Sequence, residues 1–337
     1  MRKELVWAAA IGISFGLIIA FGAWRINSSL KSKTVAPTPT PTSQNIGEAS
    51  ITLDKPEDDD VVTVTPVAVS GITKPLSWIT VSGEKGDYII QSDETGAFSQ
   101  DVDLVGGVNQ IKITAFDSTG NQSSQKVLVV YSSSFQLTTI ATPTPGTSTS
   151  ESDIRANVAE KVAQALSNPK AYIGVVTDIA DSTIQIKTPD SQIQQVSIGG
   201  NGITVMNVKG TNNKQIKLTD IAIGDFIVAM GYVNSNSVLA AQRILVTDPI
   251  TEPELTISMA KVTTAPKKSL SMTGIKDNTQ VTITPDKNTG LESYSSGATK
   301  NIKLTAISQG DLIIYVIDNS GTSPITRSVF DVGPSKS

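Results

Sequence analysis

The chain has 337 residues, a formal net charge of -4, and neither cysteine nor histidine. Disulfides, thiolate nucleophiles, imidazole bases and thiolate or imidazole metal sites are therefore excluded. Aromatic residues make up only 5% of the chain, and the acidic bias is confined to residues 49–132, which carry 5 basic and 12 acidic groups. Because no basic stripe is present to neutralise phosphates, nucleic acid is not an expected partner.

The N-terminus contains one uncharged, strongly apolar segment from Leu5 to Trp24. As a helix it would span about 30 Å, the thickness of the bilayer core. It predicts a transmembrane helix at 5–24, with residues 1–4 as a cytoplasmic tip and the C-terminal bulk outside a cell membrane that the chain crosses once. A cleaved signal peptide is the alternative, because Ala20-Phe21-Gly22 resembles a small-residue cleavage site.

Small residues recur every four positions along this segment, at Ala8, Gly12, Gly16 and Ala20. Such a stripe allows two membrane helices to approach closely, so a homodimer is one expectation. The alternative is that glycine and alanine are simply frequent in membrane helices.

Two stretches rich in Thr and Pro are predicted to be extended spacers, because alternating prolines favour polyproline II geometry. The first, Thr34 to Gln44, lies in a linker at 25–48, and the second, Thr138 to Ser152, defines a linker at 133–150. Between the linkers, period-two patterns broken by turn residues predict about seven short strands, which is typical of an antiparallel sandwich.

The segment 49–132 also resembles a known family. The residues that carry the resemblance are Gly71, Ile79-x-Val81-x-Gly83, Gly96-x-Phe98, Leu104, Gly107-x-Asn109-x-Ile111 and Ala115-x-Asp117-x-x-Gly120-Asn121. They are similar to the bacterial immunoglobulin-like (glucodextranase B-like) domains of surface proteins. The resemblance implies an Ig-like β-sandwich that serves as an extracytoplasmic spacer, adhesion or binding module.

Two features of this segment allow a functional interpretation beside a structural one. Trp78 is either an exposed platform for stacking a sugar or, the favoured interpretation, a packed side chain. The acidic run Glu57 to Asp60, together with Asp101, Asp103 or Asp117, is either a set of calcium ligands or, preferably, a solvated acidic turn.

The second half of the chain begins with an expected amphipathic helix at 151–169, where Ile154, Val158, Val162 and Leu166 repeat every four residues. Residues 170–248 and 255–333, joined by a linker at 249–254, then form a tandem repeat. The repeat is clearest in IKLTDIAIGDFIV from Ile216 and IKLTAISQGDLII from Ile302. It resembles the small OB-like β-barrel modules of exported bacterial proteins, and the resemblance implies two tandem barrels.

The turn Gly-Asp occurs in both copies of the phrase, as Gly224-Asp225 and Gly310-Asp311. We expect these glycines to occupy a barrel corner that requires positive φ or has little room for a Cβ. The aspartates are expected to cap the turn.

The overall fold class is mainly β, with a transmembrane helix and one amphipathic helix. No phosphate loop, nucleophile elbow or paired carboxylates in a deep cleft are evident, so no catalytic, cofactor-binding or metal-binding residue is predicted. We expect a non-enzymatic, membrane-anchored envelope protein for surface display, adhesion or scaffolding. The alternative is a carbohydrate-binding accessory module of the envelope, and the expected partner is envelope polysaccharide or a surface protein. Transmembrane signalling is disfavoured because residues 1–4 are too few for a cytoplasmic domain.

Overall fold

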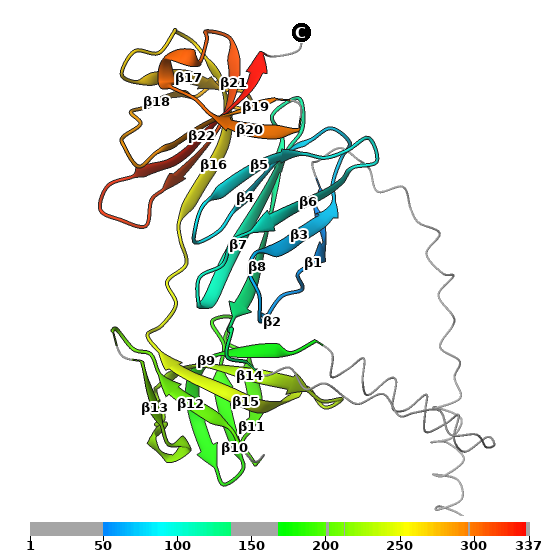
Figure 1. Cartoon of the computed structure of the whole chain (residues 1–337), viewed down its shortest axis with the longest axis vertical. Helices are drawn as coiled ribbons and strands as arrows, with labels where there is room; N and C mark the ends of the chain where they lie inside the picture. The colour runs from blue at the N-terminus through cyan, green and yellow to red at the C-terminus, as the bar shows by residue number, and fades with distance from the viewer. Residues whose placement is uncertain (1–49, 136–167, 200–201, 212, 296, 335–337) are drawn as a thin grey trace, which may run out of the picture. The chain divides into compact units, whose positions relative to one another are not determined.

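The computed structural model describes residues 50–135, 168–199, 202–211, 213–295 and 297–334 (Figure 1). These residues are mainly β, with two short 3-10 helices. The expected transmembrane helix at 5–24, its stripe of small residues and the amphipathic stretch from Ile154 to Leu166 lie outside the described residues. Within the described ranges, no helix is long and apolar enough to cross a bilayer.

Residues 52–131 form the expected sandwich. One sheet has the order β1-β3-β6 and the facing sheet contains β2-β8-β7-β4-β5. The strands are β1 (Thr52–Lys55), β2 (Asp60–Val62), β3 (Val67–Ile72), β4 (Trp78–Ser82), β5 (Asp87–Gln91), β6 (Ala97–Val102), β7 (Gly107–Phe116) and β8 (Gln122–Tyr131). The period-two pattern explains the core, because alternate residues such as Ile79, Val81, Ile111 and Ile113 point between the sheets and are fully buried.

Strand β2 was not predicted and departs from the antiparallel arrangement, since it pairs with β8 in parallel. It has only three residues and directly follows the acidic run, so its sequence carries too little alternation to be recognised. One further pairing, Asp60 with Lys170, joins β2 to the first repeat and makes the sheet continuous across the boundary.

The first repeat pairs its strands in a closed circuit, β9-β10-β11-β15-β14 and back to β9. Its elements are β9 (Lys170–Ala180), β10 (Thr183–Lys187), β11 (Ile193–Ser197), β12 (Thr204–Asn207), β13 (Lys214–Ile216), η1 (Leu218–Asp220), β14 (Phe226–Val233) and β15 (Val238–Thr247). The pairing of β11 with β15 is parallel and the other four are antiparallel. Strand β12 adds to β15 outside the circuit and carries β13.

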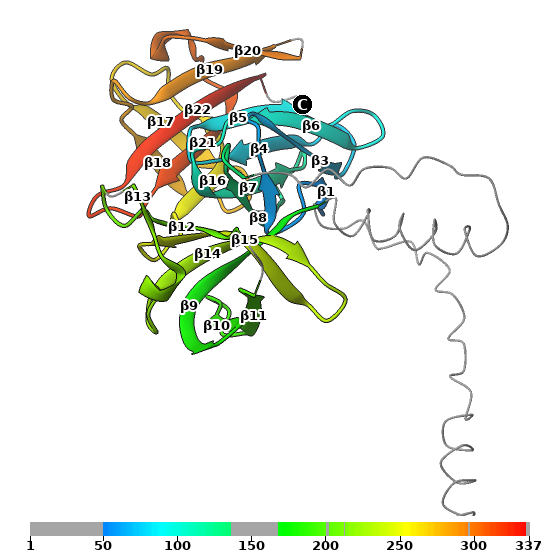
Figure 2. The same cartoon turned by 60° about the horizontal axis from the view of Figure 1, so that its bottom comes forward.

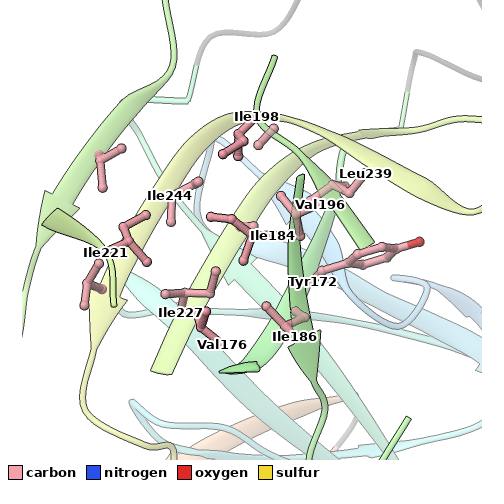
Figure 3. Packing of buried hydrophobic residues seen from close by; sticks show 14 residues of the cluster. Tyr172, Val176, Ile184, Ile186, Val196, Ile198, Ile221, Ile227, Leu239 and Ile244 are labelled. Carbon is pink, nitrogen blue, oxygen red and sulfur yellow. The ribbon is translucent and has the colours of Figure 1, made fainter. Parts of the chain in front are cut away.

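Aliphatic side chains fill the inside of this circuit (Figure 3). Five of these side chains point toward one another from four strands of the circuit, β10, β11, β14 and β15. They are Ile184, Ile186, Val196, Ile227 and Ile244. Each is at most 1% exposed, so burial of these aliphatic side chains stabilises the first repeat.

The second repeat follows the same strand sequence but not the same closure. Its elements are β16 (Leu255–Val262), β17 (Leu270–Gly274), β18 (Gln280–Ile283), β19 (Gly290–Ser295), β20 (Ala298–Asn301), η2 (Leu304–Ala306), β21 (Asp311–Asp318) and β22 (Ile325–Pro334). They form a seven-stranded sheet, β18-β17-β16-β21-β22-β19-β20, and Figure 2 shows β19 and β20 beside β22. The first repeat closes where β11 pairs with β15. The corresponding strands of the second repeat, β18 and β22, do not pair within the described residues, so the expectation of two barrels that close alike is wrong. The two segments nevertheless share one pairing, because β19 pairs with β22 in parallel as β12 does with β15.

The duplicated turn has the same geometry in both copies. Gly224 and Gly310 have φ of +95° and +97°, a conformation that side chains with a Cβ rarely adopt. Their amides donate to Val176 O and Val262 O, both at 2.9 Å. The expectation of little space was wrong: no atom lies within 4 Å of a Cβ built at either position. The constraint is therefore the backbone conformation alone.

Apolar side chains also pack between the sandwich and each repeat. Val61, Val130 and Phe135 share one buried cluster with residues of the first repeat, including Met230 and Tyr232. Phe135 lies in the segment expected to begin a linker at residue 133, yet it is 5% exposed and its ring centroid is 6.3 Å from that of Tyr232. A second cluster joins the sandwich to the second repeat and includes Ile89, Phe116, Ile257, Ile314 and Phe330.

Candidate functional site

A cavity of about 610 Å³ lies between the sandwich and the first repeat. Two sandwich segments, at the start of β7 and the end of β8, form one wall, and β14, β15 and the chain around β12 and β13 form the other. The lining residues are Gly106, Gly107, Val108, Tyr131, Ser132, Ser133, Ser134, Val208, Asn213, Val228, Arg243, Leu245, Thr247 and Ile250. Arg243 is the only charged residue among them, and none is acidic.

The alternation of β15 brings Arg243 to this cavity. Ile244 and Val246 point into the aliphatic interior of the first repeat, so Arg243, Leu245 and Thr247 point to the opposite face. The backbone of Arg243 is held on both sides, because it pairs with Met230 of β14 and Thr204 of β12. Arg243 therefore projects from a strand that is paired on both sides, not from a loop.

Among the described residues, the Arg243 side chain has no counterion. Its Nε is buried without a hydrogen-bond partner, and no carboxylate of the described residues forms an ion pair with it. Burial lowers the pKa of Arg243, although an arginine of this kind stays protonated. A half-buried cation with no partner is costly in a folded protein, so this position favours an anion from outside the chain.

The sandwich wall is fixed by one buried amide. The Oδ1 of Asn109 accepts from Val105 N at 2.7 Å, while its Nδ2 donates to Val105 O at 2.8 Å and to Gly107 O at 3.0 Å. Asn109 is fully buried, so these bonds hold the Gly106-Gly107 corner in place, where Gly107 has a φ of +99°. The loop geometry is therefore preorganised rather than dependent on a ligand.

The other sandwich segment supplies hydroxyl groups. Ser132 donates its amide to Val62 O at 2.9 Å, and Phe135 donates its amide to Ser132 O at 3.0 Å and is itself buried. This anchors the three-serine segment 132–134 at both ends. These three serines line the cavity together with Thr247 and Asn213, so both walls carry neutral hydrogen-bonding residues.

These groups support binding rather than catalysis. The lining contains no carboxylate, so it has no acid and base pair for glycoside hydrolysis, and the serines have no adjacent base to activate them. One fixed cation with several neutral hydrogen-bonding groups is suited to holding a polar, anionic ligand.

The acidic run is only partly the solvated turn that was expected: Glu57 and Asp58 are exposed, whereas Asp59 and Asp60 are half-buried. Lys170 Nζ lies 2.8 Å from Asp60 Oδ1 and 2.8 Å from Glu57 Oε2, and Asp58 Oδ1 accepts from Leu128 N at 2.8 Å. The run therefore docks the sandwich to the first repeat. Within the described ranges, no three acidic side chains are grouped so that they could hold a metal ion.

The remaining proposed calcium ligands are also apart from the run. Asp117 Oδ1 accepts from the amides of Thr119 and Asn121, both at 3.0 Å, and so caps the turn between β7 and β8. Asp101 lies on β6, and Asp103 just follows it. Asp117 is therefore a turn-capping residue rather than part of a site with the acidic run.

A second, smaller cavity of about 380 Å³ borders the acidic run and includes Asp58, Asp59 and Gln194 in its lining. Burial, and next the charge of Asp58, raise the pKa of Asp59 to about 6. Carboxylates predominate here and the described residues place no unpaired cation among them, so the larger cavity is the stronger candidate.

Trp78 is packed rather than displayed. Its ring centroid lies 5.0 Å from that of Tyr294 in the second repeat, with the ring planes at 88°. Ile79 and Val81 are core residues of the sandwich, and the opposite face of the strand is covered by the second repeat. The interpretation of a sugar-stacking platform is therefore wrong, and the packed interpretation is confirmed.

The duplicated aspartates cap their turns as predicted. Asp225 Oδ2 accepts from Ala222 N at 2.9 Å, and Asp311 Oδ2 accepts from Ser308 N at 2.7 Å. Asp225 also forms an ion pair with Lys209 at 2.7 Å. Neither aspartate lines the candidate cavity.

Sequence reasoning did not single out Arg243. In the strand VLAAQRILV it reads as one polar residue on a solvent-facing position, and nothing local distinguishes it from an exposed arginine. Its isolation depends on the sandwich segments that cover it, which lie more than a hundred residues away in the sequence.

Comparison with known proteins identifies the sandwich. Residues 49–132 match the family model described as glucodextranase, domain B, which confirms the Ig-like domain expected there. The match covers a minority of the chain and concerns a non-catalytic module. A comparison with curated proteins gives no match.

Solved structures give weak likenesses to the whole chain. They include a structure of a 1.5-MDa bacterial ice-binding adhesin, at 10% identity and a TM-score of 0.20, covering 85% of this chain and 98% of the other. Dimeric latent PorU from Porphyromonas gingivalis has 8% identity and a TM-score of 0.21, with coverage of 85% and 34%. Protocadherin gamma B2 has 8% identity and a TM-score of 0.16, with coverage of 86% and 61%. At these TM-scores the likenesses carry no argument.

Proposed function

We propose that the chain is a non-enzymatic cell-envelope protein, held in the membrane by the segment 5–24, that displays a binding surface outside the cell. The observation that carries this proposal is the bacterial Ig-like sandwich at 49–132, joined to both repeats through buried apolar clusters. Such a framework holds the Arg243 cavity in a fixed geometry. Surface display, adhesion or scaffolding is the function.

The proposal includes a finer description of the fold. The closed circuit of the first repeat, with its parallel β11-β15 contact, supports an OB-like barrel, and the second repeat is an opened version of it. The domain limits at 49–132, 170–248 and 255–333 remain predictions, as does their independent folding. The two buried clusters predict that a separated sandwich is less stable than the joined chain, because it exposes residues such as Phe116 and Val130.

Protease protection in intact cells tests the location. A chain with a C-terminal epitope tag should be found in the membrane fraction, and protease added outside should remove the tag and digest the chain beyond about Lys33. A variant with Gly16→Arg and Ile18→Arg is the control, since charges in the bilayer core oppose insertion. Recovery of the full-length parent chain in the soluble cytosolic fraction contradicts the proposal.

The same proposal allows a homodimer through Ala8, Gly12, Gly16 and Ala20. Gly12→Ile and Gly16→Ile should reduce crosslinked dimer in membranes, because larger side chains keep the helices apart. Ala10→Ile, on the other side of such a helix, is the matched control. Equal crosslinking in all three variants contradicts a dimer through this stripe.

Carbohydrate binding is the second candidate function, and the Arg243 cavity favours it. The observation is the set of hydroxyl and amide groups around one unpaired cation. Glycan capture by the full-length chain separates the two candidates, since a purely structural scaffold retains no saccharide.

A further inference from the structure

We propose that the cavity between the sandwich and the first repeat binds an anionic sugar unit of an envelope polysaccharide, with its anionic group on Arg243. This inference rests on the proposed function for the source of the ligand, but not for the chemistry of the site. The shared chemistry is a singly charged oxyanion attached to a polyhydroxylated unit, whether a uronic acid carboxylate or a sugar-alcohol phosphodiester.

Charge is the first argument. Among the described residues that line the cavity, Arg243 is the only charged one and none carries a carboxylate, and the Arg243 Nε is buried without a hydrogen-bond partner. A guanidinium presents donors in a planar fork that matches a carboxylate or phosphate, and it binds them more strongly where water is partly excluded. One oxyanion would balance the charge of the cavity.

The neutral groups are the second argument. Ser132, Ser133 and Ser134 on one wall face the same cavity as Thr247 and Asn213 on the other. Hydroxyl and amide groups both donate and accept hydrogen bonds, so they can match sugar hydroxyls whatever their orientation.

Size and rigidity are the third argument. The volume of about 610 Å³ lies within the range of small-ligand sites. The walls are held by the buried Asn109 amide and by the sheet pairing of Arg243. Because the walls are already ordered, binding costs little conformational entropy.

The experiment measures binding to the full-length purified chain by titration calorimetry. The probes are tri-galacturonate, a glycerol phosphate oligomer and the neutral maltotriose. We expect saturable binding of at least one anionic probe and none of maltotriose. Arg243→Gln should weaken that binding by at least about tenfold, since a charge-assisted bond is lost, and Arg243→Lys should weaken it less.

Two further variants control for charge and for folding. Lys187→Gln removes the same charge from an exposed position of the first repeat and should change binding less than about twofold. Ser133→Ala should weaken binding with no loss of melting temperature, which keeps the test valid if Arg243→Gln unfolds the repeat. Without ligand, Arg243→Gln should melt at or above the parent temperature, because no protein partner is lost.

The outcomes separate the two proposals. Failure of both anionic probes to bind, equal binding by Arg243→Gln and the parent, or equal binding of maltotriose overturns the site. Binding of only one anionic probe supports the site and identifies the source of the oxyanion. If the chain is cytosolic and still binds an anionic probe through Arg243, the location proposal fails and the site stands.

Discussion

Arg327 of the second repeat lies 3.1 Å from the carboxylate of Asp87 in the sandwich, and that carboxylate side chain is only 1% exposed. The same guanidinium donates to Gly83 O at 2.6 Å, and Ser328 Oγ donates to Asp87 Oδ2 at 2.7 Å. Side chains more than two hundred residues apart in sequence thus form one polar contact beside a buried apolar cluster. The charged and apolar contacts together hold the second repeat against the sandwich.

Removing this cation should strongly destabilise the chain. Arg327→Ala leaves a buried carboxylate without its counterion, which typically costs about 3 to 5 kcal/mol. Lys126→Ala is the control, because its ion pair with Glu252 is exposed on both sides and is worth at most about 1 kcal/mol. Urea melts followed by circular dichroism measure both, and equal losses contradict a special role for Arg327.

Substitution of the glycines in the duplicated turn should lower stability because of the backbone conformation there, not because of steric crowding. Gly224→Val and Gly310→Val place a β-branched residue at positive φ and should each cost about 1 to 3 kcal/mol. Gly86→Val is the matched control, since that glycine also has open space around it but lies outside the positive-φ region. A melting temperature for Gly224→Val equal to that of Gly86→Val argues against the conformational explanation.

Asp59 should lower stability at neutral pH. Its folded-state pKa of about 6 exceeds the ordinary value of 3.8, so the charged form is disfavoured by folding. The penalty is present above pH 6 and disappears as the pH falls through 6 toward 4. Asp59→Asn should therefore raise the free energy of unfolding at pH 7 by about 1 to 3 kcal/mol and have little effect at pH 4. Asparagine also tolerates the φ of +63° at this position.

The measurement is a series of urea melts at pH values from 4 to 8. Asp54→Asn, at an exposed position of β1, serves as the control for the loss of a surface charge. A destabilised Asp59→Asn at pH 7 contradicts the assignment of a desolvated carboxylate.

Unlike Asp59, Asp117 should increase the stability of the folded chain at neutral pH, and this contribution should be lost in acid. Burial tends to raise its pKa, but hydrogen bonds from Thr119 and Asn121 outweigh burial and lower the pKa to about 2. A depressed pKa contributes stability that is complete above about pH 4 and is lost as the pH falls toward 2. Asp117→Asn should thus be less stable than the parent at pH 5, and the difference should shrink by pH 2. Asp101→Asn, on an exposed part of β6, is the control.

Trp78 provides an optical test of the contact with the second repeat. The chain has three tryptophans, so Trp7→Phe with Trp24→Phe leaves Trp78 as the only one. Its emission should be blue-shifted and weakly quenched by acrylamide, and Tyr294→Ala should shift it to the red because the edge contact is lost. Leu76→Ala changes an exposed neighbour and should leave the emission unchanged. No shift on Tyr294→Ala would falsify the packed arrangement.

Several strands and turns could be predicted from local sequence patterns alone. Alternating residues around Ile79 and Ile113 located the sandwich strands, because one face of each strand must be buried. The duplicated phrase located the repeat and its turns, since the φ at Gly224 and Gly310 follows from a local requirement that glycine satisfies. Asp117 and Asp225 were likewise predictable, because their capping bonds reach only a few residues along the chain.

The tertiary structure alone decided which surfaces meet. The acidic run was predicted to face water, but Lys170 lies beside it because β2 pairs with β9. Trp78 has a polar-looking strand face that the second repeat covers. Arg243 became a candidate ligand-binding residue only because distant sandwich loops cover it and bring no carboxylate. Burial and charge pairing between remote segments depend on long-range packing. The alternation of apolar residues within a strand indicates that one face is buried, but it does not indicate which segment covers that face.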